Sequence, residues 1–181
     1  MTLVELLVAI AILSLILFPI YEFLRQGAAS WEVGENRTEV MQNARVGIKK
    51  VTRELKGALS VYSMSASSIR FWARDKNNDD VADPDEIVTF NWDGTPPGEL
   101  TRKLDSESTA SPAAEYVDDF EMTFLDADGN VTNTPGDVKL VTVLLHVKKS
   151  SRDHDYTTIL RSGADLRNIS KSDETGKKSK K

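Results

Sequence analysis

The chain has no cysteine and only two histidines, His146 and His154. Disulfides, thiolate metal sites and covalent haem attachment are therefore excluded, and imidazole clusters for metal or acid–base chemistry have few residues to draw on. Basic residues are also in the minority, because 23 Lys and Arg stand against 28 Asp and Glu, a formal net charge of −5. This balance argues against a broad positive surface, so no nucleic-acid partner is expected.

Recognisable catalytic signatures are absent from the sequence as well. It contains no Gly-x-Ser-x-Gly nucleophile turn, phosphate loop, His-Glu-x-x-His zinc motif or dinucleotide fingerprint. His154 lies between Asp153 and Asp155, an arrangement more typical of an exposed turn than of a metal centre. We therefore predict a protein that is not an enzyme. A site built from carboxylates alone is the enzymatic alternative.

What the sequence does contain is a long apolar run at its start. Residues 3–24 read LVELLVAIAILSLILFPIYEFL, broken only by Glu5, Ser14, Pro19 and Glu22. At about 1.5 Å per residue the run gives roughly 33 Å of helix, close to the hydrocarbon thickness of a bilayer. A cleavable signal peptide would begin with basic residues, and no Lys or Arg precedes Arg25. A generic membrane anchor does not account for Glu5, since an unpaired carboxylate is costly in apolar surroundings.

Residues 1–13, MTLVELLVAIAIL, resemble the mature N-terminus of type IV pilins and of the pseudopilins of type II secretion systems. Met1 stands where the family usually has phenylalanine, and Pro19 lies three positions before its usual proline. The resemblance implies that a peptidase removes a basic leader and that the amine of Met1 is methylated. It also implies that Glu5 pairs with the N-terminal amine of a neighbouring subunit and sets the axial register of a filament. The alternative is an acid that reaches the membrane interface.

Beyond Arg25 the sequence predicts that the helix continues with one apolar face. Steps of three and four residues connect Val40, Ala44, Ile48, Val51, Leu55, Leu59 and Tyr62. We expect one helix from near Thr2 to about Leu59, with a local bend or melted turn at Pro19 or near Gly34. Residues 43–55, NARVGIKKVTREL, also resemble J-type minor pseudopilins and W-type minor pilins, although an ordinary helix that packs on a sheet would show the same pattern.

After Tyr62 the apolar period changes to two, which is typical of strands. The predicted strands cover residues 69–72, 87–92, 100–104, 120–124, 138–147 and 156–160, and turn residues separate them. The expected fold class is α+β, with a long N-terminal helix packed on an antiparallel sheet, as in pilins. The predicted parts are a transmembrane or filament-core helix (1–25), its amphipathic continuation (26–62), a β-rich head (63–169) and a flexible, lysine-rich tail (170–181).

The acidic segment 75–86, DKNNDDVADPDE, is the motif most similar to a metal site. Oxygen ligands have the spacing of an EF-hand-type calcium loop, at Asp75, Asn77, Asp79, Asp83 and Glu86, with the Val81 carbonyl at position seven. Asp80 occupies position six, where the sharp turn prefers glycine, and no flanking helix is predicted. Calcium is the expected cofactor, in a structural role, and a solvated acidic turn is the alternative. Residues 126–130 are predicted to form a hairpin turn.

These features predict a structural subunit of a type IV filament system, most similar to a minor pseudopilin that initiates or caps a secretion pseudopilus. The alternatives are a minor or major type IV pilin, serving adhesion, motility or DNA uptake, and a membrane-tethered calcium-binding module. The resemblance implies other pilins or pseudopilins as partners through the N-terminal helix, together with an inner-membrane assembly platform and, before assembly, membrane lipid. It implies a single-pass inner-membrane protein with its head in the periplasm, later assembled into a periplasmic or extracellular filament.

Overall fold

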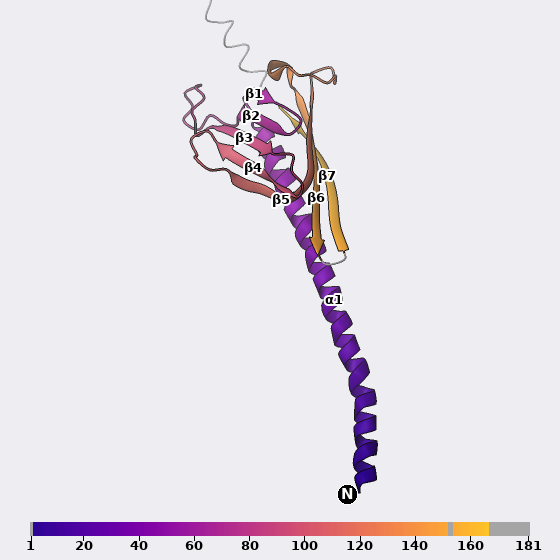
Figure 1. Cartoon of the computed structure of the whole chain (residues 1–181). Helices are drawn as coiled ribbons and strands as arrows, with labels where there is room; N and C mark the ends of the chain where they lie inside the picture. Colours follow the sequence, from indigo (N-terminus) through magenta and orange to yellow (C-terminus); the bar gives the residue numbers. More distant parts are fainter. Residues whose placement is uncertain (1, 152–153, 167–181) are drawn as a thin grey trace, which may run out of the picture. The chain divides into compact units, whose positions relative to one another are not determined.

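The computed structural model describes residues 2–151 and 154–166 (Figure 1). Its elements follow the order α1 (Leu3–Lys56), β1 (Ser60–Met64), β2 (Ser68–Trp72), β3 (Ile87–Trp92), β4 (Gly98–Leu104), β5 (Ser111–Leu125), the 3-10 turn η1 (Pro135–Asp137), β6 (Leu140–Ser151) and β7 (His154–Asp165). Met1 and the predicted tail 170–181 lie outside the described residues.

The chain divides into two compact units, residues 1–38 and 39–181. The described part of the first unit is the N-terminal portion of α1, which stays helical through both Pro19 and Gly34. The melted turn expected at one of these positions is therefore not found. A proline removes one backbone donor, and the hydrogen bonds of the adjacent turns are enough to continue the helix.

The second unit contains a single antiparallel sheet of seven strands that lie in chain order, from β1 to β7 (Figure 1). Residues 39–56 of α1 cover this sheet with their apolar stripe. Together the helix and the sheet confirm the predicted α+β class. The last two strands pair from Leu140↔Asp165 to Ser151↔His154 without a register shift, whereas the pairing of β5 with β6 shifts between Val117 and Asp119.

The apolar stripe of α1 forms one side of the core. Five of its predicted members are at most 6% exposed: Val40, Ala44, Ile48, Val51 and Leu55. They share the core with sheet residues such as Phe71 and Phe90, whose rings stack at 6.3 Å. Since all buried core residues fall between positions 40 and 166, this unit carries its own hydrophobic core.

Three polar contacts fix the same part of α1 along the sheet. Lys149 on β6 donates to the Glu39 carboxylate at 2.6 Å. The Asn43 amide donates to the Glu115 carbonyl on β5 at 2.6 Å and accepts from the Glu115 amide at 3.2 Å. Arg102 on β4 donates from Nε to both oxygens of Glu54, each at 2.9 Å. Contacts to three different strands therefore fix residues 39–56 of α1 on the sheet.

The end of α1 differs from the prediction. The helix stops at Lys56, where the amides of Gly57 and Ala58 bond three residues back, to Glu54 and Leu55, and so close a tighter last turn. The next residues enter the sheet, because the Leu59 amide donates to the Trp72 carbonyl at 2.8 Å. The prediction was therefore wrong for Tyr62, which lies in β1 and is 40% exposed.

Candidate functional sites

The first candidate site is the apolar N-terminal part of α1. Its large apolar side chains, from Leu3 to Leu24, are 49–76% exposed, and its most apolar window has a mean hydropathy of 2.8 with none of it buried. This segment is long and apolar enough to cross a membrane. An uncovered apolar surface of this size is unfavourable in water, so lipid or other protein must cover it. The only hydroxyl in the middle of the run is satisfied locally, since Ser14 Oγ donates to the Ala11 carbonyl at 2.8 Å.

Glu5 takes part in a reciprocal cap at the start of this helix. Its carboxylate accepts from the Thr2 amide at 2.7 Å through Oε2, and its own amide donates to Thr2 Oγ1 at 3.4 Å. This is the capping-box arrangement of a Thr followed three residues later by a Glu. The Thr-x-x-Glu spacing at residues 2–5 is a sequence signal for this cap.

The cap constrains what Glu5 is able to do. It holds the negative charge beside the first helical turn, where the exposed amides of the helix favour an anion. Among the described residues, only one of the two carboxylate oxygens has a hydrogen-bond partner. Glu5 is therefore fixed in position and still able to accept from a further donor. The predicted amine partner, Met1, lies outside the described residues.

The second candidate site is the acidic segment between β2 and β3. The Asp75 carboxylate accepts from the amides of Asn78 and Asp80, at 2.6 and 3.0 Å, and folds the chain into a tight turn. Asp80 has a φ of 58°, so the residue at position six adopts the left-handed conformation for which EF-hand loops use glycine. An aspartate at position six argued against a calcium loop in the sequence. The backbone of Asp80 nevertheless adopts the left-handed conformation that the sharp turn of such a loop requires.

Three of the predicted ligands converge within this turn. The Asn77 side-chain amide donates to Asp79 Oδ2 at 2.9 Å and to Asp83 Oδ2 at 3.0 Å. A donor thus lies between two carboxylates, at the place where a cation would interact with both. Rotation of the amide would turn its oxygen toward the same place.

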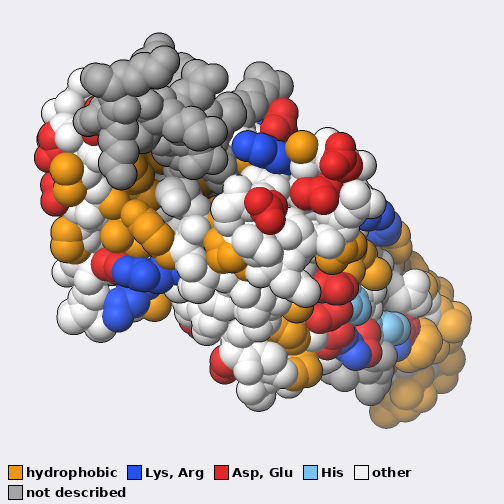
Figure 2. All heavy atoms as spheres, turned by 90° about the horizontal axis from the view of Figure 1, so that it is seen from above, with side chains coloured by type: hydrophobic (Ala, Val, Ile, Leu, Met, Phe, Trp, Pro, Cys, Tyr) orange, Lys and Arg blue, Asp and Glu red, His pale blue; other side chains and the backbone are white. Residues whose placement is uncertain are grey.

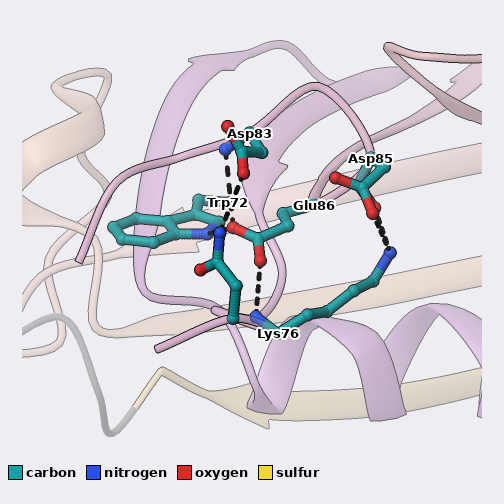
Figure 3. Close-up of polar contacts among 6 residues, drawn as sticks. Trp72, Lys76, Asp83, Asp85 and Glu86 are labelled. Atoms are coloured by element: carbon teal, nitrogen blue, oxygen red, sulfur yellow. Dashed lines mark hydrogen bonds and ion pairs between the residues drawn. The ribbon is translucent and has the colours of Figure 1, made fainter. Parts of the chain in front are cut away.

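Glu86, the predicted ligand at position twelve, has a different role. Its side chain is 2% exposed and accepts from Trp72 Nε1 at 3.0 Å and from the Lys76 amide (Figure 3). The Asp83 amide also points to it, at 3.4 Å. Glu86 therefore connects the two ends of the loop to β2 from inside, where a charged group needs such partners. A bidentate metal bond would require it to give them up.

Next to this anchor, the Lys76 ammonium binds the Asp85 carboxylate at 2.8 Å on the outer side of the loop (Figure 3). This hydrogen bond lowers the pKa of Asp85 below its usual value. Among residues 2–151 and 154–166, no three Asp, Glu, His or Cys side chains are grouped closely enough to hold a metal ion. Of the predicted ligands, Asp79 and Asp83 both accept from the Asn77 side-chain amide, whereas Glu86 is held by Trp72 and the Lys76 amide.

The other polar positions singled out in the sequence have structural surroundings. Asp126 accepts from the amides of Asp128 and Asn130, both at 2.9 Å, and these backbone bonds lower its pKa, so residues 126–130 form the predicted turn. His154 begins β7 and is exposed. The Nδ1 atom of His146 lies 3.1 Å from Oδ2 of Asp118. On the face drawn in Figure 2, the acidic side chains of the described residues lie in several separate groups.

No protein-family model matches the chain, and no curated protein sequence matches it at a significant level.

Proposed function

We propose that the chain is a structural subunit of a type IV filament system, anchored by the apolar part of α1 before it assembles. One observation carries the proposal: the apolar segment of α1 is exposed along its whole length, while the head has a complete core of its own. The segment is not needed to fold the head, so its apolar surface serves an environment outside the chain. Lipid and a bundle of like helices are the two environments that can cover such a surface.

Glu5 favours the bundle as the final environment. A simple anchor needs Glu5 only as a helix cap, a role that an uncharged glutamine would also fill, whereas a bundle of parallel, staggered helices places the charged carboxylate beside the N-terminal amine of a neighbour. Pairing there offsets the cost of removing both charges from water, and a subunit placed out of register leaves a charge uncompensated. The cap supports this role, because it holds Glu5 ready at the helix start with one oxygen unengaged.

Glu5→Gln tests the proposal, since glutamine keeps the capping hydrogen bond and removes only the charge. Two differently tagged full-length copies are co-expressed and their association in membranes is measured by cross-linking and co-purification. We expect the substitution to reduce association at least about a hundredfold, because an uncompensated buried charge costs roughly 3–5 kcal/mol.

Glu22→Gln is the matched control. It removes an acid at the other end of the apolar segment, one that pairs with Arg25 at 3.0 Å on the exposed surface. The control variant should associate like the wild type. If Glu5→Gln also associates normally, Glu5 serves only as a helix cap and the filament proposal loses its basis.

Within this class, the resemblance of residues 43–55 favours a minor pseudopilin of the J type, and a minor or major type IV pilin is the alternative. Inner-membrane insertion with the head in the periplasm belongs to the same proposal. The partners would be other pilin-like helices, the assembly platform and, before assembly, lipid.

A membrane-tethered calcium-binding module is the second candidate function. It is favoured by the left-handed Asp80 and by the convergence of Asp79 and Asp83 on Asn77. Calcium would stabilise the loop through hard oxygen ligands, and it is compatible with either function. What separates the two functions is the requirement for the Glu5 charge.

A further inference from the structure

Trp31 is an exposed aromatic residue that no contact within the described chain explains. It lies in α1 beyond the apolar run, and its side chain is among the most exposed of the large apolar residues, at 78%. Among the residues that the structure describes, its indole N–H has no hydrogen-bond partner. The other two tryptophans serve the head, because Trp72 donates to Glu86 at 3.0 Å and Trp92 packs against the core. The large apolar surface of Trp31 therefore indicates a contact outside the chain.

Charged side chains mark where a hydrocarbon layer would end on this helix. Glu22 and Arg25 form an exposed ion pair, with 3.0 Å between Oε2 and Nη2, and charged groups near the end of a spanning helix reach toward water. The boundary therefore lies close to Leu24, the last residue of the apolar run. Trp31 follows seven residues later, which is roughly 10 Å along the helix.

The direction of the side chain brings the indole back toward that boundary. In an α-helix a long side chain leans toward the N-terminus and covers the turn before its own Cα, about 5 Å back. The indole of Trp31 is therefore expected roughly 5 Å beyond the apolar run. The headgroup layer of a bilayer is about 5–8 Å thick on each side, so the ring falls within it.

The helix surface between the apolar run and this ring suits such a position. Gly27 and Ala28 lie four and three residues before Trp31, on the same face of the helix. Leu24 lies on this face too, seven residues before the tryptophan. None of these residues is charged, and nothing in the described chain lies within 4 Å of a Cβ built on Gly27. One open face of α1 thus reaches Trp31 without a charge, so lipid is able to cover it.

We propose that Trp31 is an interfacial anchor, whose indole lies among the lipid headgroups where α1 leaves the membrane. Tryptophan suits this layer because its rings contact the acyl boundary while its N–H donates to headgroup oxygens. With Glu5 at the other end of the apolar run, Trp31 sets the depth of the helix before assembly. This inference rests on the membrane-anchored state in the proposed function, and it requires only a single copy of the chain.

Depth-dependent quenching of tryptophan fluorescence tests the anchor in the full-length chain. The protein is inserted into phosphatidylethanolamine–phosphatidylglycerol vesicles in which some lipids carry a nitroxide, either on the headgroup or in the middle of an acyl chain. We expect the headgroup nitroxide to quench part of the emission and the mid-chain nitroxide to quench much less. Trp31→Phe should abolish this quenching, since Trp72 and Trp92 are half-buried in the head.

Two matched variants calibrate the depth. Trp31→Phe/Leu15→Trp places the fluorophore in the middle of the apolar run and should be quenched by the mid-chain nitroxide. Trp31→Phe/Arg37→Trp places it six residues further along α1, about 9 Å beyond the native position, and should escape both quenchers. All three substituted positions are exposed, so the variants leave the core of the head intact.

The calibration also separates this inference from the proposed function. If the Leu15→Trp variant is quenched but wild-type emission is not, α1 enters the membrane while Trp31 contacts water or another protein, and the anchor is refuted. Equal quenching of Trp31 by the mid-chain nitroxide would place the ring in hydrocarbon and refute it as well. If neither nitroxide quenches the Leu15→Trp variant, α1 does not enter the bilayer, which contradicts both the anchor and the membrane-anchored subunit.

Discussion

At the scale of single residues, Gly47 decides how closely α1 approaches the sheet. A Cβ atom built on this glycine would lie 2.6 Å from the Ala114 side chain and 3.2 Å from the Ala113 carbonyl oxygen. The first distance is too short for two carbons, so any other residue would push the helix away from β5. The close packing of α1 on β5 therefore requires a residue without a side chain at position 47.

We expect Gly47→Ala to lower the free energy of unfolding by about 1–2 kcal/mol, since overpacking costs about 1–3 kcal/mol and better helix propensity returns up to about 1 kcal/mol. The measurement is thermal unfolding of the full chain in detergent. Gly34→Ala is the control, because nothing lies within 4 Å of a Cβ at that position. It should leave the midpoint unchanged or raise it, and equal behaviour of the two variants would contradict the close approach.

Local sequence patterns identified individual residues only where the relevant partner lies nearby in the chain. The Thr-x-x-Glu spacing could have revealed the cap at Glu5, because both groups are three residues apart. The role of Glu86 was not predictable in this way. Its half-buried partner Trp72 ends β2, fourteen residues earlier in the chain, and the loop spacing of the acids pointed instead to a metal ligand.

At the scale of elements, the loop between β2 and β3 has two parts. In one part Asp79 and Asp83 converge on Asn77, where a cation could bind; in the other, Glu86 holds the loop through hydrogen bonds that require no cation. We expect calcium to raise the free energy of unfolding by about 1.4 kcal/mol when its concentration is ten times the dissociation constant. In the full chain this corresponds to a rise in the melting temperature of roughly 3–6 °C. Thermal unfolding with calcium and with a chelator measures the difference.

Asp79→Ala should abolish the calcium response, because it removes one of the two carboxylates that flank Asn77. Asp126→Ala removes an acid from a different turn and should retain the response. A melting temperature that is insensitive to millimolar calcium in all three proteins would show that the loop is held by Asp75 and Glu86 alone.

Periodicity predicted the elements better than their ends. The helical stripe from Val40 to Leu55 is buried as expected, and the strands β2, β3 and β4 lie close to their predicted ranges. β1 was missed because Leu59 and Tyr62 continue the helical steps after the helix has ended. β5 begins at Ser111, well before its regular alternation, where the small residues Ala113 and Ala114 carry little apolar signal.

At the scale of the whole molecule, the α+β class followed from the change of apolar period after α1. Strand order and register did not follow, because they depend on contacts between strands that no local pattern encodes. The exposed apolar segment was readable from composition alone. Its function depends on whether lipid or the helices of other subunits surround it, and the proposed function requires other subunits in the assembled state.

The most direct measurement is photo-cross-linking along the apolar segment. A photoreactive side chain replaces each of residues 10–17 in turn, and the full-length variants are irradiated in the membranes or filaments where the protein resides. If helices of neighbouring copies or related subunits surround the segment, protein adducts will form at successive positions around a complete helical turn. Adducts to lipid alone at every position would contradict the account, because the helix would then be only an anchor.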